Sequence, residues 1–427
     1  MAIHFLSPAD QEPCVGCTLA NSRSNPEWWE LPLEKKRRVK NQEGKLVEIT
    51  DKPRSQWLDS LTDADTIYAP LGGIGDALLY GAWQRGVSIK RTPFTTFHHR
   101  EYRHEVEIPT KLDGVGPKQH ERLVRAAQMV ELVKAGEHDL FRDYLQVDAI
   151  IGSIRVLIGS ILAIQDEIRK PLEQRMSRLG RDQEYLLMDG KGSPKSVHNL
   201  KVSFLQSADP VAELKKSEEE LSRKIDKLLT KLPVWTEVLE PVCGIGPRLS
   251  GRIIGPIADI RRFGTLGGFR KYCGWAVILS KDGAYTTADK FRHGESAAFH
   301  AVVRQGFWLF EEQILKQKGC QFKYFYLKYK LEHQSQIGQV MYQRNGDTPV
   351  VMTKVWLHKR ALRYAASRLV DYLYWMWWGL HGTKFYHSDT GELITQDDLL
   401  NPERYYGPLP ASAENEEPEE GGEDTKS

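Results

Sequence analysis

The chain has 427 residues, long enough for two or three domains that each bury a core of their own. Hydrophobic residues make up 41% and charged residues 27%, which excludes an intrinsically disordered or fibrous protein. The net charge is +2, but the stretch from Ala411 to Ser427 holds seven acids and one lysine, a balance of −6 that leaves +8 for the rest. A basic body with an acidic, Gly- and Glu-rich tail is typical of a nucleic-acid-binding protein.

The cysteines and the hydropathy of the sequence indicate which kinds of site and which cellular location to expect. Of the five cysteines only Cys14 and Cys17 lie close together, and a structural zinc site generally needs a second pair, so neither zinc nor a disulfide framework is expected. The first thirty residues lack the apolar segment of a signal peptide. No apolar run approaches the ~20 residues of a membrane span, so we expect no membrane partner and a cytoplasmic location.

The N-terminal third predicts two regions. Residues 1–44 are polar and predict an irregular basic segment, whose run Lys35–Arg38 is either a solvated linker or a nucleic-acid contact. Residues 45–118 predict a small α/β domain with strands at 46–49, 66–69 and 87–89 and a helix between the last two, hence a parallel strand pair. The glycines before that helix lack the lysine of a phosphate loop, so no nucleotide cofactor is expected.

Residues 119–233 predict long helices. Apolar residues recur at spacings of three and four over 119–134, 150–172 and 214–232, and a Gly-, Ser- and Lys-rich loop separates the last two stripes at 189–209. Two such helices pair antiparallel or dimerise, so we expect a helical hairpin and a homodimer or higher oligomer. The fold class is therefore α/β plus all-α.

Residues 234–385 predict a further domain, followed by an extension over 386–427 that ends in the acidic tail. An aromatic and basic stretch spans 321–330, and a helix with one apolar face spans about 353–379. The aromatic end of that helix is typical of a core or interface contact.

The first motif that carries chemistry is Gly244-Ile245-Gly246, which lies between two amphipathic segments. Glycines allow a sharp turn and leave amide groups free to face a phosphate, next to the positive end of the following helix. This is how a helix-hairpin-helix grips the DNA backbone. Arg248 and Arg252 would add charge. The alternative is an ordinary turn that connects two helices.

The second motif places one hydroxyl at the end of a short apolar strand. Ser280 follows Ala276–Leu279 and precedes Lys281-Asp-Gly283, with Lys290 and Arg292 nearby. One interpretation is a β-turn, which each of these residues suits. The other is a serine nucleophile whose neighbouring cations stabilise the charge that develops on a phosphate. Attack on a phosphodiester would conserve the bond energy in a protein–DNA ester.

Residues 234–310 resemble the C-terminal domain of the insertion sequence 110/116/902 family of transposases, which is related to the Piv invertases. The resemblance rests on five pieces of this sequence: Gly244-Ile-Gly-Pro247, Ile257-Ala-Asp-Ile-Arg-Arg-Phe263, Tyr272-Cys-Gly-Trp275, Ser280-Lys-Asp-Gly283 and Arg292-His-Gly294. The family motif has Gly where this chain has Ala258. The long helical pair and the closing helix also look like the layout of the family.

The resemblance implies an N-terminal RNase H/RuvC-like domain with four metal-binding acids, and a C-terminal serine that acts with them. Ser280 matches that nucleophile. Of the acids only Asp113 has a candidate counterpart, so the domain is expected to be degenerate, with Mg²⁺ as the possible metal. The implied partners are DNA and a structured RNA from the same mobile element, and the implied location is nucleoid-associated.

Two functions are therefore carried forward from the sequence. The first is a divergent DNA transposase or site-specific recombinase that cuts and rejoins DNA through Ser280. The second is a catalytically inactive derivative that binds DNA or RNA through the hairpin and the helical pair. The missing acids favour the second, and the Ser280 motif favours the first.

Overall fold

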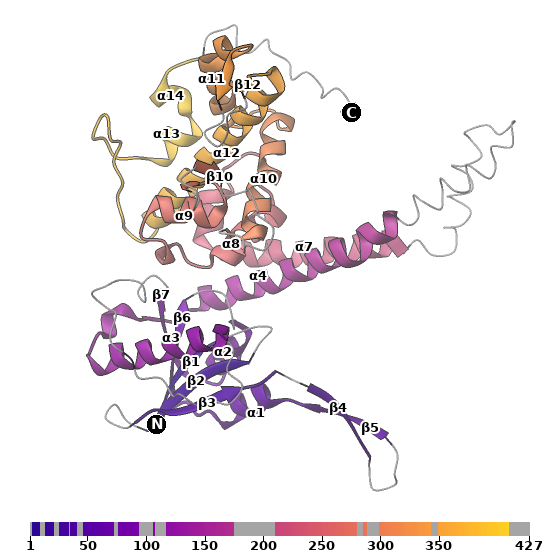
Figure 1. Ribbon diagram of the computed structural model, residues 1–427, viewed down its shortest axis with the longest axis vertical. Coiled ribbons are helices and arrows are strands. Elements are labelled where there is room, and N and C mark those ends of the chain that lie inside the picture. The colour runs from indigo at the N-terminus through magenta and orange to yellow at the C-terminus, as the bar shows by residue number, and fades with distance from the viewer. Residues whose placement is uncertain are drawn as a thin grey trace, which may run out of the picture. The chain divides into compact units, whose positions relative to one another are not determined.

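The computed structural model describes residues 2–8, 13–20, 25–33, 35–40, 46–71, 76–93, 106, 117–174, 210–279, 285–287, 299–342 and 349–409 (Figure 1). The chain divides into two compact units, each assembled from separated segments. The first unit comprises Met1–Gly152, Pro256–Ala301 and Tyr374–Leu393, and the second comprises Ser153–Gly255, Val302–Leu373 and Ile394–Ser427. The units thus combine segments that sequence reasoning assigned to different domains.

The first unit is built on a six-stranded mixed sheet of order β3-β2-β1-β6-β7-β8. Strands β1 to β3 are antiparallel, β6 runs parallel to β1 and to β7, and β8 closes the edge antiparallel to β7. The strands are β1 Ile3–Ser7, β2 Cys14–Leu19, β3 Glu27–Leu31, β6 Thr66–Leu71, β7 Ser88–Pro93 and β8 Arg142–Asp143. The predicted strands at 46–49 and 66–69 and the parallel pair are confirmed.

The N-terminal region differs from the expected irregular basic segment, because residues before 44 supply β1, β2, β3 and β4. The sheet is covered on both faces, so Phe5 packs into one apolar cluster and Leu6 into the other. The two cysteines of β2 divide in the same way: Cys14 belongs to the cluster with Leu6 and Cys17 to the cluster with Phe5. Both thiols are therefore core groups on opposite faces of the sheet.

Helices and two antiparallel strand pairs complete the first unit. The helix α3 packs on the face that carries Phe5, and α2 packs on the opposite face. The remaining elements of this unit are α1 Pro53–Ser60, α2 Asp76–Trp83, α3 Pro117–Lys134, η3 His138–Leu140, η6 Ile260–Arg262, α9 Leu266–Cys273, the antiparallel pair β9 Val277–Leu279 and β10 Tyr285–Thr287, and the antiparallel pair β4 Lys35–Lys40 and β5 Leu46–Asp51.

The second unit is mostly helical. Several helices cross the boundary between the units. These include α4 Gln146–Ala163, α8 Pro247–Ile257 and α12 Lys354–Gly379. Its other elements are η4 Ile164–Arg169, α7 Pro210–Leu229, η5 Val234–Leu239, α10 Ala301–Lys316, α11 Lys323–His333, η7 Gln334–Gln336, the pair β11 Val340–Tyr342 and β12 Pro349–Val351, α13 Gln396–Leu400 and α14 Pro402–Tyr406.

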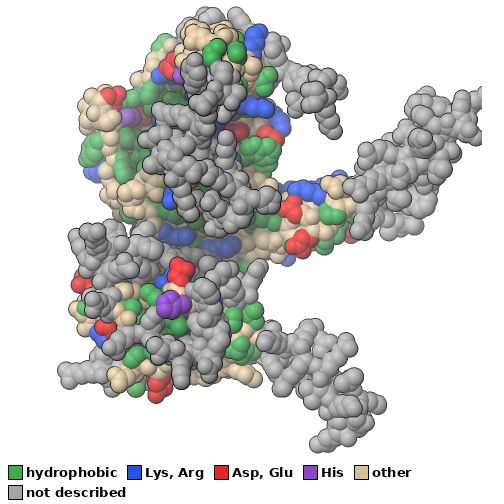
Figure 2. Space-filling model, viewed as in Figure 1, with side chains coloured by type: hydrophobic (Ala, Val, Ile, Leu, Met, Phe, Trp, Pro, Cys, Tyr) green, Lys and Arg blue, Asp and Glu red, His purple; other side chains and the backbone are tan. Residues whose placement is uncertain are grey.

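The helical pair predicted over 150–172 and 214–232 is formed by α4, η4 and α7, which lie side by side (Figure 1). Charged side chains of both signs line its exposed face (Figure 2). Within the described part of the chain, one helical run, Gln146–Gln174, is long and apolar enough to cross a bilayer. Its Arg169 pairs with the buried carboxylate of Glu218 on the neighbouring helix, as expected of a helix that packs within a protein. The predicted loop at 189–209 lies outside the described residues.

Candidate nucleic-acid interface

The turn that precedes α8 contains two glycines with different surroundings. Gly244 adopts a φ of +93°, a conformation that L side chains rarely take, so a glycine is required at this position. Gly246 is exposed, and a Cβ built on it would meet nothing within 4 Å. Its carbonyl accepts from the amide of Ser250, which makes Gly246 the N-cap of α8, with Pro247 at the first helical position.

The turn is fixed to the connection between α10 and α11. The Gln321 side chain accepts from the amide of Cys243 at 3.0 Å and donates to the carbonyl of Pro241 at 3.0 Å. The thiol of Cys320 donates to the carbonyl of Cys243 at 3.5 Å. Gly244 faces Gln313 of α10, whose Cβ would lie 3.0 Å from a Cβ at Gly244. The turn is thereby held in place while Gly246 remains open.

Arg248 lies in the first turn of α8 and is about two-fifths exposed. Its Nε donates to the hydroxyl of Ser222 at 2.7 Å, and its Nη2 lies 3.5 Å from the Glu218 carboxylate of α7. The guanidinium is therefore positioned beside the turn and can still reach solvent. It remains a candidate phosphate contact.

Arg252 differs from the expectation of a phosphate-contacting cation. It is only 6% exposed, and its guanidinium donates to the side-chain oxygens of Gln305 at 2.8 Å and Gln165 at 2.9 Å. Burial lowers the pKa of Arg252. Arg252 lies one helical turn after Arg248, on a side of α8 that faces η4 and α10. Its bonds to Gln165 and Gln305 therefore connect helices within the second unit.

The α8 helix is packed closely along its length. A Cβ at Gly251 would lie 3.0 Å from the Ile158 side chain of α4 and 3.2 Å from that of Ile225 of α7, so glycine permits this approach. The carbonyl of Gly255 accepts two bonds from Arg155, at 3.0 and 2.6 Å. A guanidinium thus binds the negative C-terminal end of the helix while its N-terminal end stays exposed.

Ser280 lies outside the described residues, as do Lys281, Lys290 and Arg292. The strand β9 ends at Leu279, directly before Ser280, and pairs antiparallel with β10 through Leu279 and Tyr285. These residues fall within the first unit, whereas the turn at Gly246 belongs to the second. Within the described residues, the predicted site is thus represented by the turn and Arg248.

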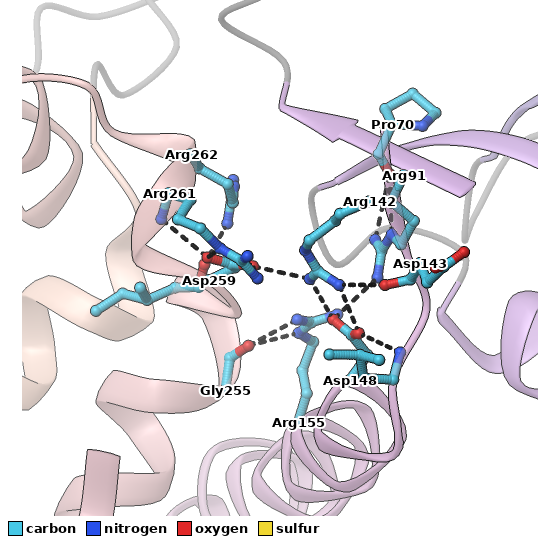
Figure 3. Close-up of polar contacts among 12 residues, drawn as sticks. Pro70, Arg91, Arg142, Asp143, Asp148, Arg155, Gly255, Asp259, Arg261 and Arg262 are labelled. Atoms are coloured by element: carbon cyan, nitrogen blue, oxygen red, sulfur yellow. Dashed lines mark hydrogen bonds and ion pairs between the residues drawn. The ribbon is translucent and has the colours of Figure 1, made fainter. Parts of the chain in front are cut away.

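Sequence reasoning missed a buried charge cluster in the first unit (Figure 3). Arg142 of β8 binds both carboxylate oxygens of Asp148, at 2.8 and 2.6 Å, and its Nη2 lies 2.8 Å from Asp259. Arg91 of β7, only 1% exposed, is the cross-strand neighbour of Arg142 and lies 3.9 Å from Asp148. Two like charges face one another across the strands, and the carboxylates compensate them.

Asp259 is held by two guanidiniums in this cluster. It accepts from Arg261 through both oxygens, at 3.0 and 2.7 Å, and it is 5% exposed. Burial by itself would raise the pKa of Asp259, but the hydrogen bonds and charges of Arg261 and Arg142 outweigh it and lower the pKa to about 2. The cluster of Arg91, Arg142, Asp148, Asp259 and Arg261 therefore carries more positive than negative charge.

The residue before Asp259 has an uncommon backbone. Ala258 is the only non-glycine residue with a positive φ among the described residues, at +61°. For a residue with a Cβ this left-handed conformation costs roughly 1 kcal/mol relative to glycine. The turn puts the Asp259 side chain where it caps η6 by accepting from the amide of Arg261.

A metal site is not formed by the described side chains, among which no three His, Cys, Asp or Glu groups gather. Asp113, the candidate metal ligand, lies outside the described residues. Neither β1 nor β6 contains Asp or Glu, and the neighbouring strand β7 carries the buried Arg91. The two buried carboxylates of the cluster are neutralised by arginines, an environment that disfavours a bound cation.

Comparison with known proteins gives no relative: no family model, no curated protein and no solved structure matches the chain. Function must therefore be inferred from the motifs and from the geometry described above.

Proposed function

We propose that this chain is a divergent DNA transposase or site-specific recombinase that cuts and rejoins DNA through the hydroxyl of Ser280. The observation that carries the proposal is the turn at Gly246, which is open to solvent and lies at the exposed N-terminal end of α8 beside Arg248. Backbone amides at a helix N-terminus bind phosphate oxygens, and a turn of this kind contacts DNA without reading its sequence.

The sheet topology supports a degenerate RuvC-like domain. Three antiparallel strands lead into the parallel strands β6 and β7 beyond β1, with α2 connecting the parallel pair. This order is compatible with an RNase H/RuvC-like sheet in which β1 is central. The acids that such a domain uses are replaced on β1 by Ile3-His-Phe-Leu-Ser7.

The backbone of the motifs supports the resemblance as well. Ala258 stands where the family motif has glycine, and it adopts the left-handed conformation that glycine favours. Gly274 of the Tyr272–Trp275 motif also has a positive φ, +77°, and forms the C-cap of α9. Two motif positions thus have the geometry that a family glycine would supply.

The proposed reaction is a transesterification. The Ser280 hydroxyl oxygen attacks a DNA phosphorus, a protein–DNA phosphoester forms, and one strand leaves as an alcohol that takes up a proton. Attack by another DNA hydroxyl reverses the step and releases Ser280, so no nucleotide cofactor is consumed. Lys281, Lys290 and Arg292 would stabilise the charge on the phosphate. Mg²⁺, a structured RNA and a second copy of the chain remain implied partners.

The covalent intermediate gives a direct test. We expect supercoiled DNA from the native locus, with Mg²⁺ and transcripts of that locus, to yield a protein–DNA adduct that resists denaturant and is cleaved by protease. Ser280→Ala removes the attacking oxygen and should abolish the adduct, whereas Ser217→Ala, at an exposed serine of α7, should retain it. Equal adduct formation by Ser280→Ala would refute this role of Ser280.

A second candidate function is a nucleic-acid-binding derivative without catalysis. It is favoured by the charge cluster, where Arg91 and Arg142 hold the carboxylates of Asp148 and Asp259 in ion pairs. An arginine-rich cluster cannot take over the part of several carboxylates in holding Mg²⁺. Under this alternative the protein binds DNA as described but forms no adduct under any of the conditions above.

Because the turn at Gly246 is open, a substitution there should affect DNA binding more than the stability of the fold. Replacement of Gly246 by Val should weaken binding to duplex DNA about tenfold, because a branched side chain blocks the approach of a phosphate to the amides. The free energy of unfolding should fall by only about 1 kcal/mol, because the site is open and the loss is that of a poorer N-cap residue. Fluorescence anisotropy at several salt concentrations and urea denaturation measure the two effects.

The matched control is Gly244→Ala. It should destabilise the fold by about 1–2 kcal/mol, because the new Cβ lies 3.0 Å from Gln313 and the φ is +93°. Duplex binding by Gly246→Val that equals that of the unchanged protein would rule out the turn as the phosphate contact.

A further inference from the structure

We propose that the surface formed by α11 and the first half of α12 binds single-stranded nucleic acid by stacking unpaired bases on an aromatic and cationic ladder. The ladder consists of His333 and Tyr329 of α11 with Arg360 and Trp356 of α12. All four residues belong to the second unit and are partly exposed. This inference is independent of Ser280 and of the turn at Gly246.

The ladder is a continuous series of stacked groups. The rings of Tyr329 and His333 lie 4.0 Å apart between centroids with an interplanar angle of 11°. The Arg360 guanidinium carbon lies 5.9 Å from the Tyr329 ring centroid and 5.4 Å from that of Trp356. Arg360 thus joins Tyr329 to Trp356 through cation–π contacts. The series has an aromatic ring at each end, His333 at one and Trp356 at the other.

The ladder differs from the aromatic residues beside it, which form the core. Sequence reasoning grouped Phe322, Tyr324, Phe325, Tyr326 and Tyr329 as one aromatic and basic stretch. The first four are buried, and Tyr326 donates to or accepts from His358 at 2.9 Å. Tyr329 is the exception, since its position on α11 brings it to the partly exposed boundary with α12, 5.0 Å from the ring of Tyr364.

The charge around the ladder is strongly positive. Helices α11 and α12 carry eight Lys and Arg residues and two acids, and one of the acids, Asp371, is buried and lies 3.6 Å from Arg368. Lys354 and Lys359 are exposed, and Lys330 and Arg363 are partly exposed. These side chains can bind phosphates on either side of a stacked base.

The combination of rings and cations selects the ligand. Single-stranded nucleic acid offers a flat ring and a phosphate in each repeat, and a protein surface that binds it combines aromatic side chains with positive charge. Duplex bases are already stacked on one another, so a duplex would use only the cations. An acidic peptide likewise lacks the rings. DNA and RNA share the chemistry of an unpaired base on a phosphodiester, and the experiment compares both.

The test uses the full-length protein and fluorescein-labelled homopolymers of about 12 nucleotides, a length within the range of single-strand sites. Oligothymidylate, oligouridylate, an abasic strand and a duplex of the same length are compared by fluorescence anisotropy. We expect the base-bearing single strands to bind more tightly than the abasic strand. Trp356→Ala and His333→Ala should each weaken that binding about tenfold, and Trp356→Phe should restore most of it.

Trp308→Ala is the matched control, because Trp308 is 51% exposed on α10 of the same unit and lies outside the ladder. It should leave single-strand binding unchanged. The tighter of the DNA and RNA strands identifies the source of the ligand, and either result supports the proposal. A loss in Trp356→Ala that is equal for the duplex and the single strand would overturn it.

Two further results would overturn the proposal. The abasic strand could bind as tightly as the base-bearing strands, or polyglutamate could displace the labelled single strand as well as an unlabelled single strand does. The Gly246→Val variant distinguishes the turn at Gly246 from the ladder. If this variant weakens duplex binding and leaves single-strand binding unchanged, the ladder binds independently of the turn. A failure of the turn as a duplex contact leaves the single-strand result unaffected.

Discussion

Arg142→Met should destabilise the first unit by about 3–5 kcal/mol at neutral pH, which is the usual cost of removing one partner of a buried ion pair. Arg142 binds both oxygens of Asp148 and one of Asp259, and these two aspartates are only 6% and 5% exposed. Without the guanidinium, two buried carboxylates keep their negative charge and lose their shared cation. Urea denaturation, followed by circular dichroism, measures the change.

The control is Arg125→Met on α3 of the same unit. Arg125 pairs with Glu121 one helical turn away, and the Glu121 side chain is about two-thirds exposed. Such surface pairs contribute less than about 1 kcal/mol. Equal stability losses for Arg125→Met and Arg142→Met would show that the cluster contributes nothing beyond ordinary surface pairs.

The cluster also predicts how stability depends on pH. The pKa of Asp259 is about 2 in the folded protein, below the ordinary value of 3.8. The ionised carboxylate therefore stabilises the folded state above pH 3.8, and this contribution disappears as the pH falls from 3.8 towards 2. In Arg142→Met the pKa of Asp259 should move back towards 3.8, so the part of the acid-induced stability loss that Asp259 contributes should become smaller. An unchanged pH profile would contradict the role assigned to Arg142.

Glu218→Leu should destabilise the second unit by about 3 kcal/mol, since it leaves buried polar partners without an acceptor. The Glu218 carboxylate is 3% exposed and accepts from Gln165 at 2.7 Å and from Arg169 at 2.8 Å. These contacts join α7 to η4, and Gln165 in turn binds Arg252 of α8. One carboxylate thus organises three helical segments.

Two variants separate charge from packing at this position. Glu218→Gln keeps the size and one acceptor, so it should lose about half as much stability as Glu218→Leu. Glu220→Gln, at an exposed residue two positions along α7, should change stability by less than about 0.5 kcal/mol. If Glu218→Gln and Glu220→Gln have the same midpoint in urea, the carboxylate does not hold the helices together.

The fold was predictable where apolar residues recur on one face. The helices α3 and α12 follow such patterns and were found, whereas the strands β5 and β6 were found as short runs rich in β-branched residues. The strand β1 was missed because its sequence Ile3-His-Phe-Leu-Ser7 holds only one β-branched residue and shows no alternation. Phe5 and Leu6 are both buried, so no alternation marks the strand.

The site was predictable only in part. The glycines at 244 and 246 signal a turn, and the turn is present. The burial of the Arg252 side chain could not be predicted from the fact that it is an arginine. Its hydrogen-bond partners Gln165 and Gln305 come from distant parts of the chain. The charge cluster has no sequence signal for the same reason: Arg142, Asp148 and Asp259 look like surface residues until the fold brings them together.

The interleaving of the two units determines when the protein can fold during synthesis. The chain passes between the units five times, and α4, α8 and α12 each contain one passage. Arg142 can pair with Asp259 only after the chain has been translated to residue 259, and the first unit is complete only at Leu393. The first unit cannot finish before Leu393 has left the ribosome, so it cannot fold as a simple N-terminal unit early in synthesis. A nascent chain stalled at residue 233 would expose apolar surface and become a substrate for chaperones.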